Sequence, residues 1–265
     1  MSIICDKNIT LIDQDEFHAV DKVVMRHAFD IHNSMGRFCD ECIYQDELSQ
    51  RCRNEFQVDK EVLVRISHQN FSKSYFIDML INNSIIYELK TVESTNKTHQ
   101  KQLINYLLLT DIKHGKLLNF RPYSVESRFV STTLNSKDRM AFRLVDKQWY
   151  GDDSASRKLH ETLISLLNNW GAFLDINLYK EAISFFMNGS RVDKTPVKIQ
   201  INGRIAGTQQ MNLINDDIAF HLSAITDNPA LYETHINRLL NHTPLKMIQW
   251  INFNKKTISL KTIKK

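Results

Sequence analysis

The stretch YFIDMLINNSIIYELK, residues 75–90, decides the fold of the first half of the chain. Two runs rich in β-branched and aromatic residues, 75–81 and 85–90, flank Asn82-Asn83-Ser84, three residues that favour turns. This pattern predicts a β-hairpin closed by a three-residue loop. Counting back along both strands from that loop places Asp78 directly opposite Glu88.

Three charged residues, Asp78, Glu88 and Lys90, lie at otherwise apolar positions of this hairpin. Carboxylates directly opposite each other destabilise a sheet, because their Cβ atoms are about 4.5–5.5 Å apart. A cation between them would remove the repulsion, and Lys90 shares the face of Glu88 because side chains alternate along a strand. Two carboxylates also suit Mg²⁺, which binds one or two of them together with waters and phosphate oxygens. The alternative is an ion-pair cluster with a structural role, although buried charges contribute little net stability.

The composition is that of a globular protein. The chain has 265 residues, of which 42% are hydrophobic and 24% are charged, enough for one large or two modest domains. No long apolar run is present and the first ten residues include Asp6 and Lys7. Neither a signal peptide nor a membrane partner is therefore expected, and the predicted location is the cytoplasm. The four cysteines, all in the first fifth of the chain, are predicted to be reduced thiols.

The positive charge belongs to the second half. Residues 1–139 carry 18 Lys and Arg against 19 Asp and Glu, whereas residues 140–265 carry 16 against 11, a net charge of +5. Lys255, Lys256 and Lys261 belong to a basic C-terminal cluster that could contact the phosphates of a nucleic acid. The alternative is a solvated basic tail.

The chain contains an internal repeat. At an offset of 133 residues, LINNSIIYEL from Leu80 aligns without a gap with LINDDIAFHL from Leu213. At an offset of 135 residues, NSMGRFCDECIY ending at Tyr44 aligns with NNWGAFLDINLY ending at Tyr179. We therefore predict two tandem copies of one domain and a polar linker between them, with the copies at residues 1–135 and 157–265 and the linker at 136–156.

The second copy lacks the charged residues of the hairpin. Met211, His221 and Ser223 align with Asp78, Glu88 and Lys90. Because the apolar framework is kept without them, the fold does not require these charges, and we infer that they serve chemistry in the first copy. In the second copy, His221 and His235 could form a site for a softer metal.

Both copies are predicted to share one order of elements. In the first, an apolar stripe from Phe17 to Ile31 indicates a helix that ends at Gly36. The elements expected after it are a helix at about 40–53, strands near 62–66, 75–81 and 85–90, a helix at about 98–109, and strands near 116–120 and 126–131. This order indicates an α+β fold, a mixed β-sheet flanked by helices in an α/β sandwich, tandemly duplicated.

Asp78, followed ten residues later by Glu88-Leu89-Lys90 on the adjacent strand, resembles the active-site signature of the PD-(D/E)XK nuclease superfamily. Gln102 and Tyr106 on the following helix are similar to the Q-x-x-x-Y element of its RecB-like and lambda-exonuclease-like branches. The resemblance covers the first copy nearly end to end and implies a restriction-endonuclease-like core.

The segment IHNSMGRFCDECIY, residues 31–44, resembles the GxxExxY group of that superfamily. Gly36, Glu41 and Tyr44 stand at the expected places, whereas Phe38 stands at the glycine of the group's name.

The resemblance implies metal-dependent hydrolysis of phosphodiester bonds in nucleic acid, with DNA preferred to RNA. Asp78, Glu88 and the backbone carbonyl of Leu89 would hold Mg²⁺ or Mn²⁺, which polarises a phosphoryl oxygen and lowers the pKa of a bound water. Lys90 would orient that water or stabilise the charge that develops on the phosphate. Glu41 would complete the metal shell or act as a base.

Gln102 and Tyr106 would hold the lysine or the substrate phosphate. They could also be a polar surface residue and a core aromatic, because such spacing is common by chance. Cys39 and Cys42 resemble part of the iron-sulfur sites of some RecB-like nucleases, but helix packing explains them as well.

Two functions follow for the chain as a whole. The first is a nuclease whose degenerate second copy is a pseudo-nuclease platform for nucleic acid. The second is a non-catalytic nucleic-acid-binding or regulatory protein on a nuclease-like fold. The two copies are expected to pack as an intrachain pseudo-dimer.

Overall fold

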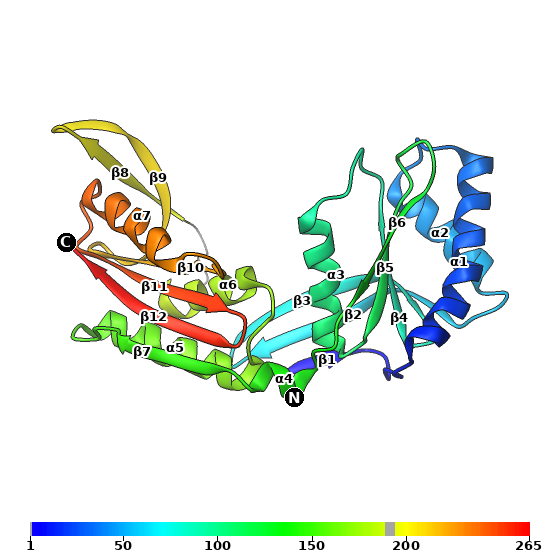
Figure 1. Cartoon of the computed structure of the whole chain (residues 1–265), viewed down its shortest axis with the longest axis horizontal. Coiled ribbons are helices and arrows are strands. Elements are labelled where there is room, and N and C mark those ends of the chain that lie inside the picture. Colours follow the sequence, from blue (N-terminus) through cyan, green and yellow to red (C-terminus); the bar gives the residue numbers. More distant parts are fainter. Residues whose placement is uncertain (1, 189–193) are drawn as a thin grey trace. The chain divides into compact units, whose positions relative to one another are not determined.

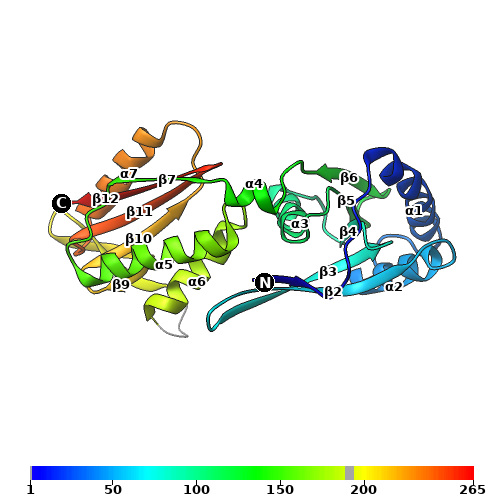
Figure 2. The same ribbon diagram turned by 90° about the horizontal axis from the view of Figure 1, so that it is seen from below.

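The computed structural model describes residues 2–188 and 194–265. They form two compact units, Met1–Ser136 and Lys137–Lys265, each with a sheet and helices of its own (Figures 1 and 2). None of the helices in the described ranges is long and apolar enough to cross a membrane. The four cysteines are free thiols.

The first unit contains every helix and strand predicted for it. Its helices are α1 (Gln14–Met35), α2 (Glu41–Cys52) and α3 (Lys97–Thr110), and its strands are β1 (Ile3–Cys5), β2 (Val58–His68), β3 (Phe71–Ile81), β4 (Ile85–Lys90), β5 (His114–Asn119) and β6 (Glu126–Ser131). Only β1 was not foreseen, because three residues are too few to show a periodic pattern. It forms by pairing with β2, with Ile4 beside Arg65.

The strands of this unit form one mixed sheet in the order β1-β2-β3-β4-β5-β6. β4 and β5 are parallel, whereas the other neighbours are antiparallel. A parallel pair needs a crossover connection, and α3 provides it. The hairpin has the predicted register, with Ile81 beside Ile85. Its loop holds Asn82 and Asn83 at φ angles of 50° and 55°, a left-handed conformation that asparagine tolerates.

The ends of α1 are fixed by capping residues. The Asp13 side chain accepts a hydrogen bond of 2.9 Å from the backbone N–H of Glu16, and the Glu16 carboxylate accepts one of 3.0 Å from the backbone N–H of Asp13. This reciprocal pair satisfies donors that the first helical turn leaves free. After the helix, Gly36 takes a φ of 73°, which glycine adopts without strain. The chain therefore turns at Gly36 into the short loop that leads to α2.

Helices cover both faces of the first sheet. α3 lies against one face, and α1 and α2 lie against the other (Figures 1 and 2). Met79, Tyr87 and Leu89 belong to the core shared with α1 and α2. Because side chains alternate along a strand, Asp78 and Glu88 point to the opposite face, toward α3. The chemistry-bearing residues therefore lie on the side of the sheet that a single helix covers.

The second unit repeats the order of elements in the first. Its helices are α4 (Ser136–Met140), which begins at the boundary, α5 (Ser154–Trp170), α6 (Ile176–Asn188) and α7 (Pro229–Asn241), and its strands are β7 (Arg143–Gln148), β8 (Thr195–Ile201), β9 (Arg204–Asn215), β10 (Ile218–Ser223), β11 (Met247–Asn254) and β12 (Thr257–Lys264). Their sheet has the order β7-β12-β11-β10-β9-β8.

Pairing registers are also alike in the two units. β10 and β11 are parallel with His221 beside Trp250, as β4 and β5 are with Glu88 beside Leu117. Both of these pairs are related by the offset of 133 found in the sequence. Corresponding residues of the two units therefore occupy corresponding places in their sheets.

The stretch 136–156, expected to be a linker, contains α4 and β7 instead. β7 pairs in parallel with β12, with Leu144 beside Ile258, and so belongs to the second sheet. Its sequence RLVDKQ is too polar to predict a buried strand, and most of its side chains are exposed. An outer strand tolerates this composition, because water hydrates its free edge.

Candidate active site

The ladder between β3 and β4 stops at the charged residues. The last backbone pair before them joins Met79 and Tyr87. At the next position the carboxylate of Asp78 replaces a backbone acceptor, and its Oδ2 accepts a hydrogen bond of 2.8 Å from the N–H of Leu89. The two strands therefore part here, in the interior of the six-stranded sheet.

The ammonium group of Lys90 lies among the oxygens of the cluster. It donates to Oε1 of Glu88 at 2.7 Å and to the backbone carbonyl of Leu89 at 2.6 Å. It lies 3.8 Å from Oδ2 of Asp78 and 3.5 Å from Oε1 of Glu41. The structure thus brings together five of the residues that the sequence singled out, with the lysine at their centre.

Glu88 is the most deeply buried member of this cluster. Its side chain is 0% exposed, and its Oε2 has no hydrogen-bond partner among the residues that the structure describes. A buried carboxylate oxygen without a partner is costly, because it has lost water and gained nothing in exchange. A divalent cation would satisfy it.

The donors around that oxygen suit Mg²⁺. Within the described ranges, no group of three or more His, Cys, Asp or Glu side chains is arranged to hold a metal ion. The donor set is therefore the carboxylates of Asp78 and Glu88 with the carbonyl of Leu89. Hard oxygens of this kind, few in number, are what Mg²⁺ uses when waters and phosphate oxygens complete its shell.

Burial changes the acidity of both carboxyl groups. Burial raises the pKa of Glu88 to about 7, the charge of Asp78 raises it further, and Lys90 opposes both effects. Burial also raises the pKa of Asp78 to about 6, against the lowering effects of Lys90 and of the Leu89 N–H. For Lys90, burial lowers the pKa, but the carboxylates of Glu88 and Asp78 outweigh it, and the net pKa is raised. The lysine is thus charged at neutral pH.

These shifts predict that the metal-free site destabilises the fold above neutral pH. The folded protein holds a proton on Glu88 up to a pKa of about 7, against an ordinary value of 4.5, so stability falls as pH rises between those values. The loss is on the order of 3 kcal/mol, at about 1.4 kcal/mol per pKa unit. In EDTA, Glu88→Gln should therefore melt higher than the wild type at pH 8 and equally at pH 4.5. Parallel melting curves across this range would contradict the assignment.

α2 contributes Glu41 and Tyr44. Glu41 is the first residue of the helix, and its side chain, 41% exposed, stands at the solvent side of Lys90. The hydroxyl of Tyr44 donates to the carbonyl of Gly36 at 2.7 Å, and its ring stacks on Phe120 with centroids 4.6 Å apart. Tyr44 therefore fixes the loop that presents Glu41.

Gln45 is a positioning residue that the sequence analysis missed. Its Nε2 donates to the backbone carbonyl of Asp78 at 2.6 Å and to Oε1 of Glu61 at 2.8 Å. It thereby holds β3 at the point where the strand parts from β4. The only sequence signal is its place next to Tyr44, where the second copy has Lys180.

α3 presents Gln102 and Tyr106. Among the hydrogen bonds of the described residues, Gln102 donates to the hydroxyl of Tyr106 at 3.0 Å and to no carboxylate. Burial raises the pKa of Tyr106 to about 12, and the nearby charges of Glu88 and Asp78 raise it as well. Tyr106 therefore stays a neutral hydrogen-bond donor beside the carboxylates, and Gln102 orients it.

The three C-terminal lysines do not form one patch. Lys255 and Lys256 belong to the turn between β11 and β12, whereas Lys261 lies on β12 and forms an ion pair of 2.6 Å with Glu233. Lys256 lies 4.0 Å from Asp138.

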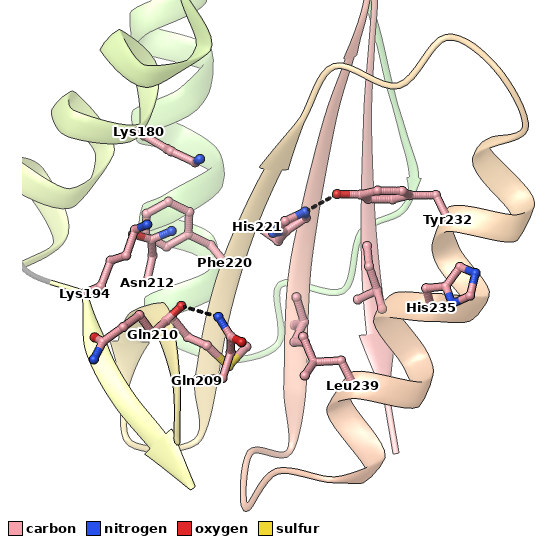
Figure 3. A pocket seen from close by; sticks show the side chains of 13 residues that line it. Lys180, Lys194, Gln209, Gln210, Asn212, Phe220, His221, Tyr232, His235 and Leu239 are labelled. Atoms are coloured by element: carbon pink, nitrogen blue, oxygen red, sulfur yellow. Dashed lines mark hydrogen bonds between the residues drawn. The ribbon is translucent and has the colours of Figure 1, made fainter. Parts of the chain in front are cut away.

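A cavity of about 380 Å³ occupies the corresponding position in the second unit. Met211 and His221 line it in the places of Asp78 and Glu88. His221 points to Tyr232 on α7, and the two share a hydrogen bond of 2.7 Å (Figure 3). Burial lowers the pKa of His221, with the charge of Lys180 adding to the effect. His235 is directed away from His221 (Figure 3), so the structure does not bring the two histidines together.

Basic and amide side chains line the rest of this cavity. They include Lys180, Lys194, Gln209, Gln210 and Asn212. The lining contains no Asp or Glu among the described residues, and neither lysine has an ion-pair partner in that part of the chain. The charge of the position is therefore opposite in the two units, negative oxygens in the first and ammonium groups in the second.

Residues 18–130 match the family model of the PD-(D/E)XK nuclease superfamily. The match lies within the first unit and spans the whole cluster from Glu41 to Tyr106, which supports a nuclease-like fold there. Nucleases of this superfamily generally use divalent metals. Neither the curated proteins nor the solved structures compared with the chain give a significant match.

Proposed function

We propose that the chain hydrolyses phosphodiester bonds of nucleic acid, with DNA preferred, at the carboxylate cluster of its first unit. Mg²⁺ or Mn²⁺ would be held by Asp78, Glu88 and the carbonyl of Leu89, and when bound it would polarise the phosphate and acidify a water. The observation that carries the proposal is the buried Oε2 of Glu88, which has no partner among the described residues. The superfamily match of this segment supports it.

Lys90 has two roles in this proposal. In the metal-free protein its ammonium group neutralises Glu88, at 2.7 Å, and occupies the carbonyl of Leu89. A cation bound to the same oxygens would release it by competition. The freed ammonium group is then within reach of a phosphate on the open side of the cluster, where it stabilises the charge that develops during hydrolysis.

Glu41 and Tyr106 flank the cluster from opposite helices. Glu41 is half-exposed at 3.5 Å from Lys90, a position from which it can accept the proton of an attacking water. Tyr106, kept neutral by its raised pKa, can donate a hydrogen bond to a phosphate oxygen. These roles need no rearrangement of the backbone.

A cleavage assay tests the proposal. Labelled single-stranded, double-stranded and branched DNA, with RNA of the same sequences, would be incubated with the protein in Mg²⁺, in Mn²⁺ and in EDTA. We expect cleavage with either metal and none in EDTA. Absence of cleavage with every substrate would favour the alternative, a nucleic-acid-binding or regulatory protein, since Lys90 already neutralises the carboxylates without a metal.

We further propose that the second unit is a degenerate copy of the first that binds the polyanion without cutting it, and that the two copies pack as a pseudo-dimer. The shared order of elements and the shared registers support the duplication. Met211 offers no hard oxygen donor for Mg²⁺. Lys180 and Lys194 in the cavity, together with Lys255, Lys256 and Lys261, offer positive charge to phosphates.

Neutralising the cavity lysines tests this role of the second unit. The variant Lys180→Gln/Lys194→Gln should bind DNA more weakly and lower the slope of log affinity against log salt by about 1–2, because each phosphate contact releases close to one counterion. Lys246→Gln is a matched control, because Lys246 is already paired with Asp217 at 2.7 Å. Binding measured by fluorescence anisotropy at several salt concentrations would settle it, and an unchanged slope would contradict the proposal. The same titration applies to Lys255, Lys256 and Lys261.

A further inference from the structure

Tyr123 and Phe38 are the two most exposed large hydrophobic side chains in the described part of the chain, at 93% and 79%. Both rings contact the guanidinium group of Arg37, whose Cζ lies 4.4 Å from the ring centroid of Tyr123 and 5.2 Å from that of Phe38. The side chain of Arg37 is only 20% exposed. We call Arg37, Phe38 and Tyr123 the stacking cluster.

The stacking cluster lies on two loops that meet the end of β4. The first loop carries Arg37 and Phe38 and leads to Glu41, which lies 3.5 Å from Lys90. The second loop follows β5 and carries Tyr123. Its first residue, Phe120, donates a backbone hydrogen bond of 2.9 Å to the carbonyl of Lys90. The exposed rings are therefore neighbours of the carboxylate cluster.

Buried side chains hold both loops in place. Tyr44 bonds Gly36 at the base of the first loop. Nε2 of His32 lies 3.0 Å from the carbonyl oxygen of Pro122, next to Tyr123, and because a carbonyl only accepts, this nitrogen donates. His32 is buried, so its role is to fix the second loop. The rings are thus presented to solvent by a rigid base.

The fold does not need these exposed rings. In the second unit, Ala172 stands at the place of Arg37 and is fully buried, and Lys256 stands at the place of Tyr123. Only Phe173 keeps the aromatic residue of Phe38. The stacking cluster therefore occurs in the unit that has the carboxylates and is lost, like them, in the other.

We propose that the stacking cluster binds unpaired nucleobases beside the active site, so that the chain acts on single-stranded nucleic acid or on a single-stranded end of a duplex. Aromatic rings stack on any base, and an arginine plane adds a cation–π contribution. Bases within a duplex are already stacked on their neighbours and leave no face for such rings. The location of this site rests on the proposed function, but its test does not, because binding is measured without cleavage.

The experiment compares two ligands in EDTA. Fluorescence anisotropy would give the affinity of the full chain for a labelled oligo-dT and for a blunt-ended hairpin duplex. We expect Phe38→Ala/Tyr123→Ala to weaken binding of oligo-dT at least about tenfold, as the loss of stacking on one or two bases implies, and to leave duplex binding unchanged. Phe38→Trp/Tyr123→Trp should restore it.

Phe76→Ala is the matched control, since Phe76 is another exposed aromatic residue of the first unit, at 50%. It should bind both ligands as the wild type does. Equal weakening for the two ligands, or no weakening, would overturn the stacking proposal. If the binding effect is seen but no substrate is cut, the proposed nuclease function fails and the base-binding site stands.

Discussion

Glu88→Gln is expected to lower the rate of Mg²⁺-dependent cleavage by at least about 10³-fold, because removal of a group that stabilises transition-state charge at a buried site costs that much. The amide keeps the shape of the side chain but cannot offer a negatively charged oxygen to a metal. The chain should remain folded, since the second unit builds the same sheet with His221 in this place. Initial rates on a labelled single strand measure the effect.

His221→Gln is the matched control for that experiment. It makes the same residue at the corresponding position of the second unit, 133 residues further on, and should cut at the rate of the wild type. Equal rates for the two variants and the wild type would show that cleavage, if present, arises elsewhere. Unfolding of Glu88→Gln would instead favour a structural ion-pair cluster.

Lys90→Met should lower the cleavage rate by about 10²- to 10³-fold while strengthening metal binding. The two effects separate because the ammonium group stabilises the developing charge in the reaction but competes for the carboxylate oxygens before it, at 2.7 Å from Glu88. Methionine keeps the length of the stem without the charge. Rates and Mn²⁺ affinity would be measured on the same preparation, and a variant that loses both together would contradict the competition.

The sequence predicted the elements of the first unit and the grouping of its charged residues, because these depend on local patterns. Apolar alternation and the Asn-Asn-Ser loop define the hairpin, and its register places Asp78 near Glu88. The break in the ladder was not predictable, because it depends on a side chain, Asp78, replacing a backbone acceptor. Gln45 was missed for a similar reason, since its partner is a backbone carbonyl 33 residues away.

Exposure was also beyond the sequence. Nothing in the residues 36–40 or 120–125 shows that Phe38 and Tyr123 would lie in solvent on either side of Arg37, because aromatic residues are usually assigned to a core. Asn119 and Asn252 carry a different lesson. Each bridges the backbone N–H and C=O of a residue in the segment after the central strand, Val92 and Ile225 respectively. The repeat alignment contained both asparagines, and only the hydrogen bonds reveal why they are kept.

Mn²⁺ binding tests the central claim most directly, namely that the carboxylates of the first unit form a metal site and the corresponding position of the second unit does not. Isothermal titration of the full chain would be compared with Glu88→Gln and His221→Gln under identical conditions. We predict binding by the wild type and by His221→Gln, and none by Glu88→Gln. Undiminished binding by Glu88→Gln, or no binding by the wild type, would contradict the account.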